Sequence, residues 1–372
     1  MSASNRSDSS TLLERNGPTY GISFTREQAD LLIDEILQKK IVTFESIDTG
    51  YNNLIFFLEV TDSSERYALK IGGRYWNKIK TEAEVQALDL LEKYTTIPVP
   101  KVLAYSSDRT NPFGVEWILM TRLPGVNMRT FIQSQPLSAA AKTCLIRDLA
   151  EYVSQMHSKM PRFDQIGALT ANGEIGTDLN RLGPWSNYEQ FIRDRIRSER
   201  TILNEDAIFA PIKDFMLNAI EQFERLRLPN FDNLPLVFSH GDLDWQNILI
   251  STDDLDAPRI TGIVDWEWSG SFPCSEEYFT SFDYFLNDSD EIRQVLFDEF
   301  EKRGIRTPRT IQHFPLLEKL NRFATNLALW HLTDLNNPDP ILVNEKLEKS
   351  RSNVRSALCT LQDQLGQTIT ND

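Results

Sequence analysis

Two aspartates and an asparagine lie inside an apolar frame in the stretch FSHGDLDWQNILI, residues 238–250. Asp242, Asp244 and Asn247 have LVF on one side and ILI on the other. An unpaired buried carboxylate destabilises a protein by far more than a turn requires, so polar residues in such a frame usually have a function. Asp242 and Asn247 are separated by the D-x-x-x-x-N interval of a kinase catalytic loop.

A second polar stretch, IVDWEWSG, has the same layout. An apolar segment is followed by Asp265, and Glu267 comes two residues later. Carboxylates and an amide at the ends of neighbouring strands are hard oxygen ligands of the kind that Mg²⁺ takes. In the kinase pattern, Asp265 is therefore expected to be the metal-binding aspartate.

A lysine and a glutamate upstream extend the pattern. Lys70, in YALKIGG, falls on a predicted strand, where a kinase lysine pairs the α- and β-phosphates of the nucleotide. Glu84 lies on the next predicted helix and is placed to hold that lysine. Glu82 is near in sequence, but it points about 200° away from Glu84, because each helical residue turns about 100°. The apolar residues that follow favour Glu84.

These residues must be positioned by a small sheet with helices. Residues 26–39 have the helical spacing of Leu and Ile. Three short β-rich segments joined by turns predict an antiparallel meander: IVTFESI, LIFFLEV and RYALKIGG. An amphipathic helix over 80–94 and two more strands follow, in IPVPKVLAYSS and EWILMTRL. Residues 21–122 are therefore predicted to form an N-terminal nucleotide-binding lobe.

The chain is predicted to become mainly helical after LPGVN, residues 123–127, a Pro-Gly break that suits a hinge. The expected helices cover 140–158, the neighbourhoods of 187–203 and 208–227, and most of 275–365. Residues 123–366 are predicted to form the C-terminal catalytic and substrate lobe. Residues 1–20 are expected to be a disordered tail and 367–372 a frayed end.

Composition narrows the class of protein. The chain has 372 residues, which favours two domains or one bilobal unit, and it is 41% hydrophobic and 25% charged. The net charge of −15 argues against nucleic-acid binding. It is compatible with a cationic partner, but solubility alone is the more ordinary reason for an acidic chain. Three scattered cysteines, a start without an apolar segment and the lack of a run of about 18 apolar residues predict a cytoplasmic location, without a signal peptide or membrane span.

The order of Lys70, Glu84, LPG, HGDLDWQN and VDWEWSG resembles the aminoglycoside phosphotransferase and choline kinase family, in particular its fungal members. The resemblance covers roughly residues 40–335. It implies an α+β fold: a bilobal protein-kinase-like fold, with a small antiparallel β-sheet in the N-terminal lobe and a larger, mainly helical C-terminal lobe.

The resemblance also implies roles for the site residues. Asp242 would accept or orient the proton of the substrate hydroxyl, and Asn247 and Asp265 would bind Mg²⁺ on the phosphates of ATP. Lys70 would hold those phosphates and Glu84 would hold Lys70.

The resemblance further assigns the nucleotide contacts outside this group. Gly50 and Asn53 belong to DTGYNNLIF, the segment that would cover the phosphates, although it has one glycine where G-x-G-x-x-G has three. Backbone groups near Thr121 and Leu123 would meet the adenine edge.

The implied activity is an ATP- and Mg²⁺-dependent kinase that phosphorylates a hydroxyl of a small molecule. A protein kinase is an alternative, although no APE triplet follows Asp265. A non-catalytic pseudokinase is another, although the chain keeps the lysine and both aspartates. The choice between ATP and GTP, the acceptor and the oligomeric state stay open.

Four acidic residues after the metal segment favour an amine on the acceptor: Glu267, Glu276, Glu277 and Asp283. No Lys or Arg lies between Asp265 and Asp290, so the mouth of the pocket is expected to be electronegative. These carboxylates also fit a solvated helix face. Which of Glu277 and Asp283 replaces the aspartate that many relatives carry in this region stays open.

Overall fold

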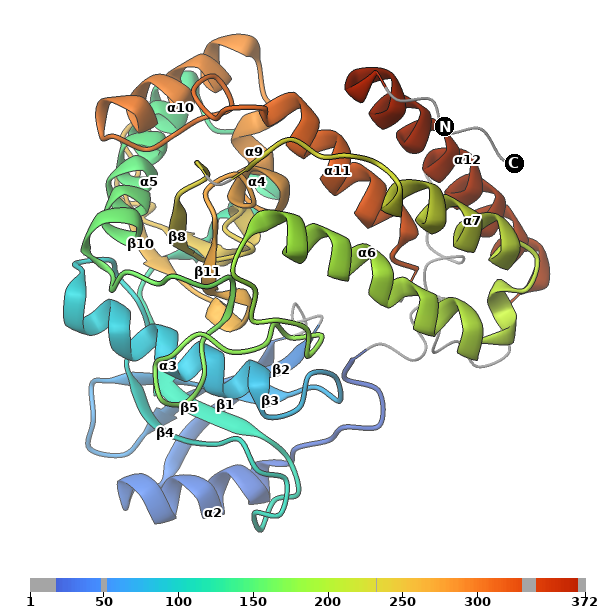
Figure 1. Cartoon of the computed structure of the whole chain (residues 1–372). Helices are drawn as coiled ribbons and strands as arrows, with labels where there is room; N and C mark the ends of the chain where they lie inside the picture. Colours follow the sequence, from blue (N-terminus) through green and yellow to red (C-terminus); the bar gives the residue numbers. More distant parts are fainter. Residues whose placement is uncertain (1–17, 48–51, 232, 330–338, 367–372) are drawn as a thin grey trace, which may run out of the picture. The chain divides into compact units, whose positions relative to one another are not determined.

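The computed structural model describes residues 18–47, 52–231, 233–329 and 339–366 (Figure 1). These residues form two compact units. The sheet unit contains residues 21–184 and 235–311, and the helical unit contains the rest. Gly50 and the predicted tails at 1–17 and 367–372 lie outside the described residues.

A five-stranded antiparallel sheet, in the order β1-β2-β3-β5-β4, begins the sheet unit. Its strands are β1 (Ile41–Ile47), β2 (Asn53–Val60), β3 (Arg66–Gly72), β4 (Val102–Ser106) and β5 (Trp117–Thr121). The predicted meander and the two further strands are confirmed. β4 begins after Pro98 and Pro100, because proline cannot donate a hydrogen bond to the ladder.

Helix α2 (Arg26–Leu37) covers one face of this sheet. A capping box between Thr25 and Gln28 starts the helix. Leu32 and Ile33 are buried on its inner side, in one core with apolar residues of β2, β3 and β5. Figure 1 shows α2 and α3 on opposite sides of the sheet.

Helix α3 (Ile79–Tyr94) confirms the helix predicted over 80–94. One side of it is buried, and this side includes Ala83, Glu84 and Ala87. Glu84 is therefore carried inward by the buried face of this helix.

The second half of the sheet unit is mainly helical. Its helices are α4 (Met128–Ser134), α5 (Ala139–Lys159), α8 (Glu277–Thr280), α9 (Asp283–Leu286) and α10 (Asp290–Lys302), with the 3₁₀ turns η2 (Trp245–Asn247) and η3 (Trp266–Trp268). Two small sheets have the orders β10-β9-β6 and β7-β11-β8. Their strands are β6 (Val126–Asn127), β7 (Gly167–Ala168), β8 (Leu236–Ser239), β9 (Ile248–Ile250), β10 (Ile260–Ile263) and β11 (Gly270–Pro273). Asp242 follows β8 and Asp265 follows β10, so both lie at strand ends.

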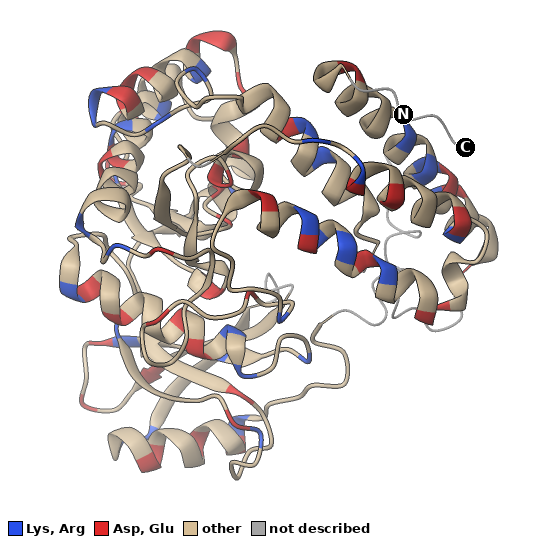
Figure 2. Ribbon diagram, viewed as in Figure 1, with Lys and Arg blue, Asp and Glu red and all other residues tan. Residues whose placement is uncertain are grey.

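The helical unit contains α6 (Tyr188–Glu205), η1 (Ala207–Phe209), α7 (Lys213–Glu224), α11 (Phe314–Leu327) and α12 (Pro340–Leu365). Phe223 and Phe323 stack between α7 and α11, with ring centroids 5.3 Å apart. Figure 2 shows charges of both signs along α6, and Arg197 there pairs with Asp194 and with Glu224 of α7. Such pairs explain how a strongly charged helix is tolerated on a surface.

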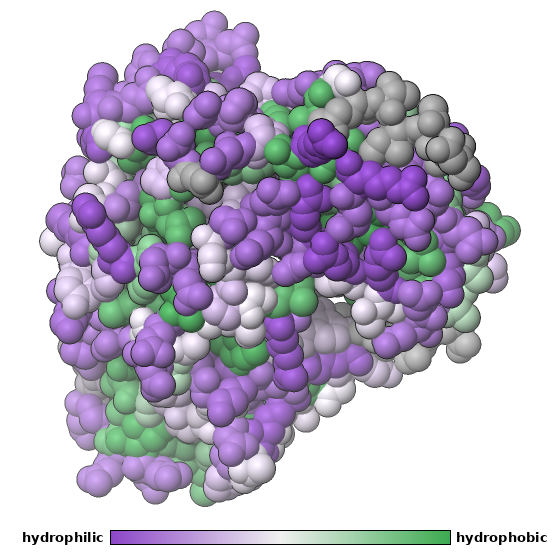
Figure 3. Space-filling model, viewed as in Figure 1, coloured by the Kyte–Doolittle hydropathy of each residue, from purple (hydrophilic) through white to green (hydrophobic). Residues whose placement is uncertain are grey.

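The structure confirms the α+β fold class, with an antiparallel N-terminal sheet and a helical C-terminal region. The face shown in Figure 3 is largely hydrophilic, and its apolar areas are interrupted by polar ones. In the described ranges, no helix combines the length and the apolar character needed to cross a bilayer.

The packing of α2 generates a stability prediction. Leu32 is 1% exposed, so Leu32→Ala should lower the free energy of unfolding by about 3 kcal/mol through lost burial and a residual cavity. Its neighbour Leu31 is 66% exposed, and Leu31→Ala should change stability by less than about 0.5 kcal/mol. Urea denaturation of the two variants measures the difference. Equal losses would contradict the assignment of this helix face.

Candidate active site

The buried ammonium of Lys70 is surrounded by three carboxylates. Its Nζ lies 2.6 Å from Glu84 Oε2, 2.6 Å from Asp265 Oδ1 and 3.0 Å from Glu267 Oε2. Burial alone lowers the pKa of Lys70, but the three negative charges outweigh it and raise this pKa well above its usual value. The structure thus brings Lys70, Glu84 and Asp265 together from β3, α3 and the residue before η3.

The backbone at Asp265 is strained in a way that aims its side chain. Its φ of +67° lies in the left-handed region, which is uncommon for a residue other than glycine. The next residue, Trp266, is fully buried, and its indole N–H donates to Ile263 O at 3.0 Å. Ser269 Oγ donates to Trp266 O at 2.6 Å. This anchored turn holds Asp265 beside Lys70.

Glu267 is fully buried, so the expectation that it lies at an electronegative pocket mouth is wrong. It accepts hydrogen bonds from Asn52 Nδ2 at 2.9 Å and Asn53 Nδ2 at 2.7 Å, besides its ion pair with Lys70. Burial acts to raise the pKa of Glu267, but the charges of Lys70 and Lys80 outweigh it and hold this pKa at about 2. The residue is a buried anion with donors on both oxygens.

Lys80 is a second buried cation that the sequence analysis did not identify. It is 2% exposed, and its Nζ donates to Asn53 Oδ1 at 2.9 Å. Burial lowers the pKa of Lys80, and the charge of Glu267 acts in the opposite direction. The sequence did contain a signal for its burial: Lys80 is four residues before Glu84, and residues four apart lie on the same face of a helix.

Asp242 and Asn247 are hydrogen-bonded to each other across η2. Asn247 Nδ2 donates to Asp242 Oδ2 at 2.9 Å and to Asp242 O at 2.8 Å. Gln246 Nε2 donates to Asp242 Oδ1 at 3.2 Å. Burial, and next the charge of Asp265, raise the pKa of Asp242 to about 7. A carboxylate with such a pKa is suited to take a proton near neutral pH.

His240 and Gly241 fix the backbone in front of Asp242. His240 Nε2 donates to Val264 O at 3.0 Å, and Nδ1 accepts from Asp242 N at 3.2 Å, which defines the tautomer. Burial lowers the pKa of His240 to about 4, so the ring is neutral and structural. Gly241 has a φ of +82°, and a Cβ there would lie 2.6 Å from Trp268 O. Only glycine fits this close approach.

The predicted nucleotide-edge residues lie at the end of β5. Thr121 N donates to Lys101 O and Arg122 N donates to Arg66 O. Leu123 lies against Gly262, where a Cβ would be 2.7 Å from Leu123 Cδ1. Asn53 begins β2 at the other end of the sheet and belongs to the Lys80–Glu267 contacts.

The acidic residues that follow the Asp265 turn in the chain are partly buried and partly exposed. Glu276 and Glu277 are 7% and 1% exposed, and Glu277 Oε2 lies 2.9 Å from His157 Nε2. Neither forms a pocket mouth, which corrects the expectation from sequence. Asp283 is exposed.

The segment that carries Asp283 is hydrogen-bonded to the residues after Asp242. Leu243 N donates to Ser281 Oγ at 2.8 Å, and Tyr284 N donates to Asp244 Oδ1 at 3.1 Å. Phe282 N donates to Leu243 O at 2.9 Å. Asp283 is therefore held close to the segment that carries Asp242.

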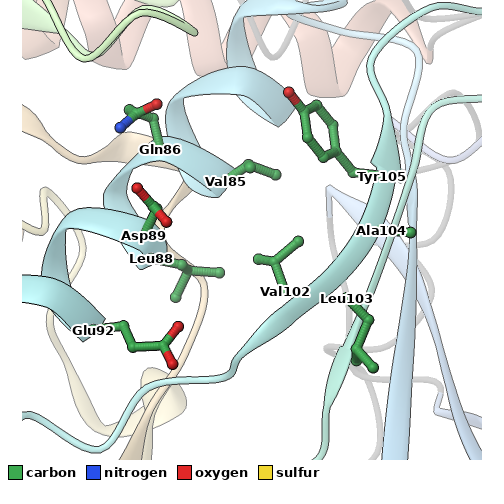
Figure 4. Close-up of a pocket in the computed structure, with 9 residues that line it drawn as sticks. All are labelled: Val85, Gln86, Leu88, Asp89, Glu92, Val102, Leu103, Ala104 and Tyr105. Atoms are coloured by element: carbon green, nitrogen blue, oxygen red, sulfur yellow. The ribbon is translucent and has the colours of Figure 1, made fainter.

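A pocket of about 460 Å³ lies between α3 and β4, apart from the residues described above (Figure 4). Val85 and Leu88 line one side and Val102 the other, with Asp89 and Glu92 at its border. It is lined by none of the site residues that the structure describes.

Comparison with known proteins gives the same family as these residues suggest. Residues 43–312 match the phosphotransferase enzyme family. A subtelomeric hrmA-associated cluster protein of Aspergillus fumigatus is 35% identical over 66% of this chain and 61% of its own length. The chain thus spans about three fifths of that relative. The mitochondrial altered inheritance of mitochondria protein 9 of Meyerozyma guilliermondii is 25% identical over 44% of this chain and 29% of its own length.

Solved structures of aminoglycoside phosphotransferases have the same kinase-like fold. The GDP and kanamycin complex of APH(2″)-IIia has a TM-score of 0.55 at 14% identity, over 88% of this chain and 99% of that one. The ADP and hygromycin B complex of an APH(4)-Ia variant has a TM-score of 0.52 at 13% identity, over 89% and 97%.

The raised pKa of Asp242 predicts a pH-dependent effect of Asp242→Asn. The folded state holds this proton more tightly than the unfolded state, in which the pKa is about 3.9, so ionisation destabilises the fold as pH rises from about 4 to 7. At pH 8 the ligand-free Asp242→Asn variant should therefore be more stable than wild type by on the order of 2 kcal/mol. The difference should vanish near pH 4.

Urea denaturation at both pH values measures this effect. Asp283→Asn, at an exposed position, is the matched control and should shift stability by less than about 0.5 kcal/mol. A loss of stability in Asp242→Asn at pH 8 would contradict the burial of this carboxylate.

Proposed function

Because the chain belongs to the phosphotransferase enzyme family, we propose that it is an ATP- and Mg²⁺-dependent kinase that phosphorylates a hydroxyl of a small molecule. The observation that carries the proposal is the ion pair of buried Lys70 with Glu84 and Asp265. In a kinase fold, this lysine holds nucleotide phosphates.

Asp242 would act on the acceptor hydroxyl. The hydroxyl oxygen forms a bond to the γ-phosphorus, the bond from that phosphorus to the β,γ-bridging oxygen breaks, and ADP leaves. The hydroxyl proton passes to the carboxylate of Asp242, whose raised pKa supports this role. Asn247 Nδ2 and Gln246 Nε2 orient the carboxylate by hydrogen bonds.

The residues near Asp242 also fit a magnesium ion. The Asp265 carboxylate and the side-chain oxygen of Asn247, whose Nδ2 faces Asp242, are hard oxygen donors of the type that Mg²⁺ selects. Bound Mg²⁺ would neutralise negative charge on the phosphates. Lys70 supplies positive charge from the protein side, and Glu84 keeps its ammonium in place.

The acceptor is proposed to be a small polar molecule that carries a hydroxyl and an amine. The similar structures named above hold kanamycin and hygromycin B. In this chain, Asp283 is the exposed carboxylate of the segment bonded to Leu243 and Asp244. It would attract a cationic group of an acceptor whose hydroxyl lies at Asp242.

Nucleotide binding tests the donor. Millimolar Mg·ATP should raise the melting temperature of wild type by several degrees, because a ligand that binds only the folded state stabilises it. Asp265→Ala should lose most of this shift. Asp242→Asn should lose turnover but keep most of the thermal shift, because its affinity for Mg·ATP should change by no more than a few-fold. Wild type without a thermal shift would contradict the proposed function.

A panel of amino alcohols, aminoglycosides, neutral sugars and sugar acids tests the acceptor. Amine-bearing alcohols should support ATP turnover, and Asp283→Asn should raise their KM about fivefold at unchanged KM for ATP, since one exposed charge pair is removed. Asp290→Asn, at the exposed start of α10, is the matched control. Turnover restricted to sugar acids would contradict the assignment.

A further inference from the structure

Glu267 joins three separate elements through its two oxygens. Oε1 accepts from Asn52 Nδ2 at 2.9 Å, and Oε2 accepts from Asn53 Nδ2 at 2.7 Å. Oε2 also lies 3.0 Å from Lys70 Nζ. With 0% exposure, the carboxylate has exchanged water entirely for protein donors. Such an arrangement stabilises a buried anion only when every donor is in place.

Lys80 holds the same two asparagines from the other side. Its Nζ donates to Asn53 Oδ1 at 2.9 Å and lies 3.4 Å from Asn52 O. The amide of Asn53 is thus fixed at both ends: its NH₂ donates to an anion and its oxygen accepts from a cation. If the amide were flipped, its oxygen would face the Glu267 carboxylate and its NH₂ group would face the Lys80 ammonium. The two contacts therefore specify one orientation of the amide.

These contacts lie between the parts that the proposed kinase must align. Asn52 and Asn53 belong to DTGYNNLIF, the segment expected to cover the phosphates, and Glu267 comes two residues after Asp265. Lys80 precedes Glu84 by one helical turn on α3. Side-chain contacts thus add to the backbone hydrogen bond that Gly73 N donates to Asn52 O at 3.1 Å.

We propose that Glu267 is a positioning residue for the donor nucleotide. With Asn52, Asn53 and Lys80 it forms a clamp that ties the start of β2 to the Asp265 turn and keeps Lys70 aimed toward the phosphates. This inference rests on the proposed function. Both oxygens of Glu267 already accept hydrogen bonds, which assigns it to holding protein groups. A preorganised site binds its ligand more tightly, because less ordering remains to be done on binding.

Calorimetric titration with Mg·ATP tests the clamp in Glu267→Gln, Asn53→Ala and the double variant. A charge-assisted hydrogen bond commonly changes an equilibrium by about tenfold or more, so each single variant should weaken Mg·ATP binding by at least about tenfold. The double variant should bind Mg·ATP only slightly less tightly than the single variant with the lower affinity, because the two changes remove the same contact. Additive losses would overturn the clamp.

Steady-state kinetics separate positioning from general damage. The KM for ATP should rise in the single variants, while the KM for the acceptor stays within about twofold, since the clamp contacts the donor side alone. Glu82→Gln is the matched control and should match wild type: Glu82 lies on α3 with Lys80, and it accepts a hydrogen bond from Ser107 Oγ outside the clamp. An equal rise in both KM values would overturn the role in donor binding.

Amide hydrogen exchange of the ligand-free protein gives a readout that does not depend on ATP. Glu267→Gln should speed exchange at the start of β2 by about tenfold or more, and Glu82→Gln should not. Unchanged exchange would overturn the clamp even if the proposed kinase activity is correct. If Glu267→Gln fails to fold, Asn53→Ala replaces it in this comparison, because it removes only a neutral amide. Wild type that binds no Mg·ATP would instead overturn the proposed function and the donor role together.

Discussion

The organisation of the sheet unit depends on the ammonium of Lys70. A buried lysine destabilises a fold unless carboxylates compensate its charge, and three carboxylates lie within 3.0 Å of this one. They come from α3 and from the turn around η3, while the lysine belongs to β3. Displacing any of these elements would leave an unpaired buried charge. The cluster therefore fixes the distance between the sheet, α3 and the Asp265 turn at the same time.

Two carboxylates near this cluster differ in pKa because their surroundings differ. Lys70 and Lys80 hold the pKa of Glu267 at about 2, so this group keeps its charge and serves as a fixed anion. Among the described residues, Asp242 has amide donors and no ion pair with a cation, and burial with the nearby charge of Asp265 raises its pKa to about 7. Environments that push the pKa values of nearby acids apart allow one to stay ionised while another exchanges a proton. The same charges that hold the fold thus prepare the chemistry of the site.

The chain shares its fold with aminoglycoside phosphotransferases at 13% to 14% identity, so the architecture does not depend on most of its side chains. The apolar pattern of strands and helices is enough to specify such a fold. Particular residues matter at close approaches. Gly241 lies against Trp268 O, and Asp265 adopts a left-handed backbone that the anchored Trp266 maintains. These positions are where the sequence of this chain has least freedom.

The sequence by itself determined the local elements and the order of the polar residues. Short β-rich segments between turns predicted the strands of the sheet, helical periodicity selected the inward face that carries Glu84, and fixed spacing linked Asp242 to Asn247. These are properties of neighbours along the chain, so a pattern of a few residues is sufficient. Only the tertiary structure decided which charges are buried and with which partners. Glu267 faces Asn53, more than two hundred residues away, and Glu277 faces His157. The excess of acidic residues predicted an acidic surface for these glutamates. Their burial and their partners could not be predicted, because desolvation and pairing arise only when distant segments pack against each other.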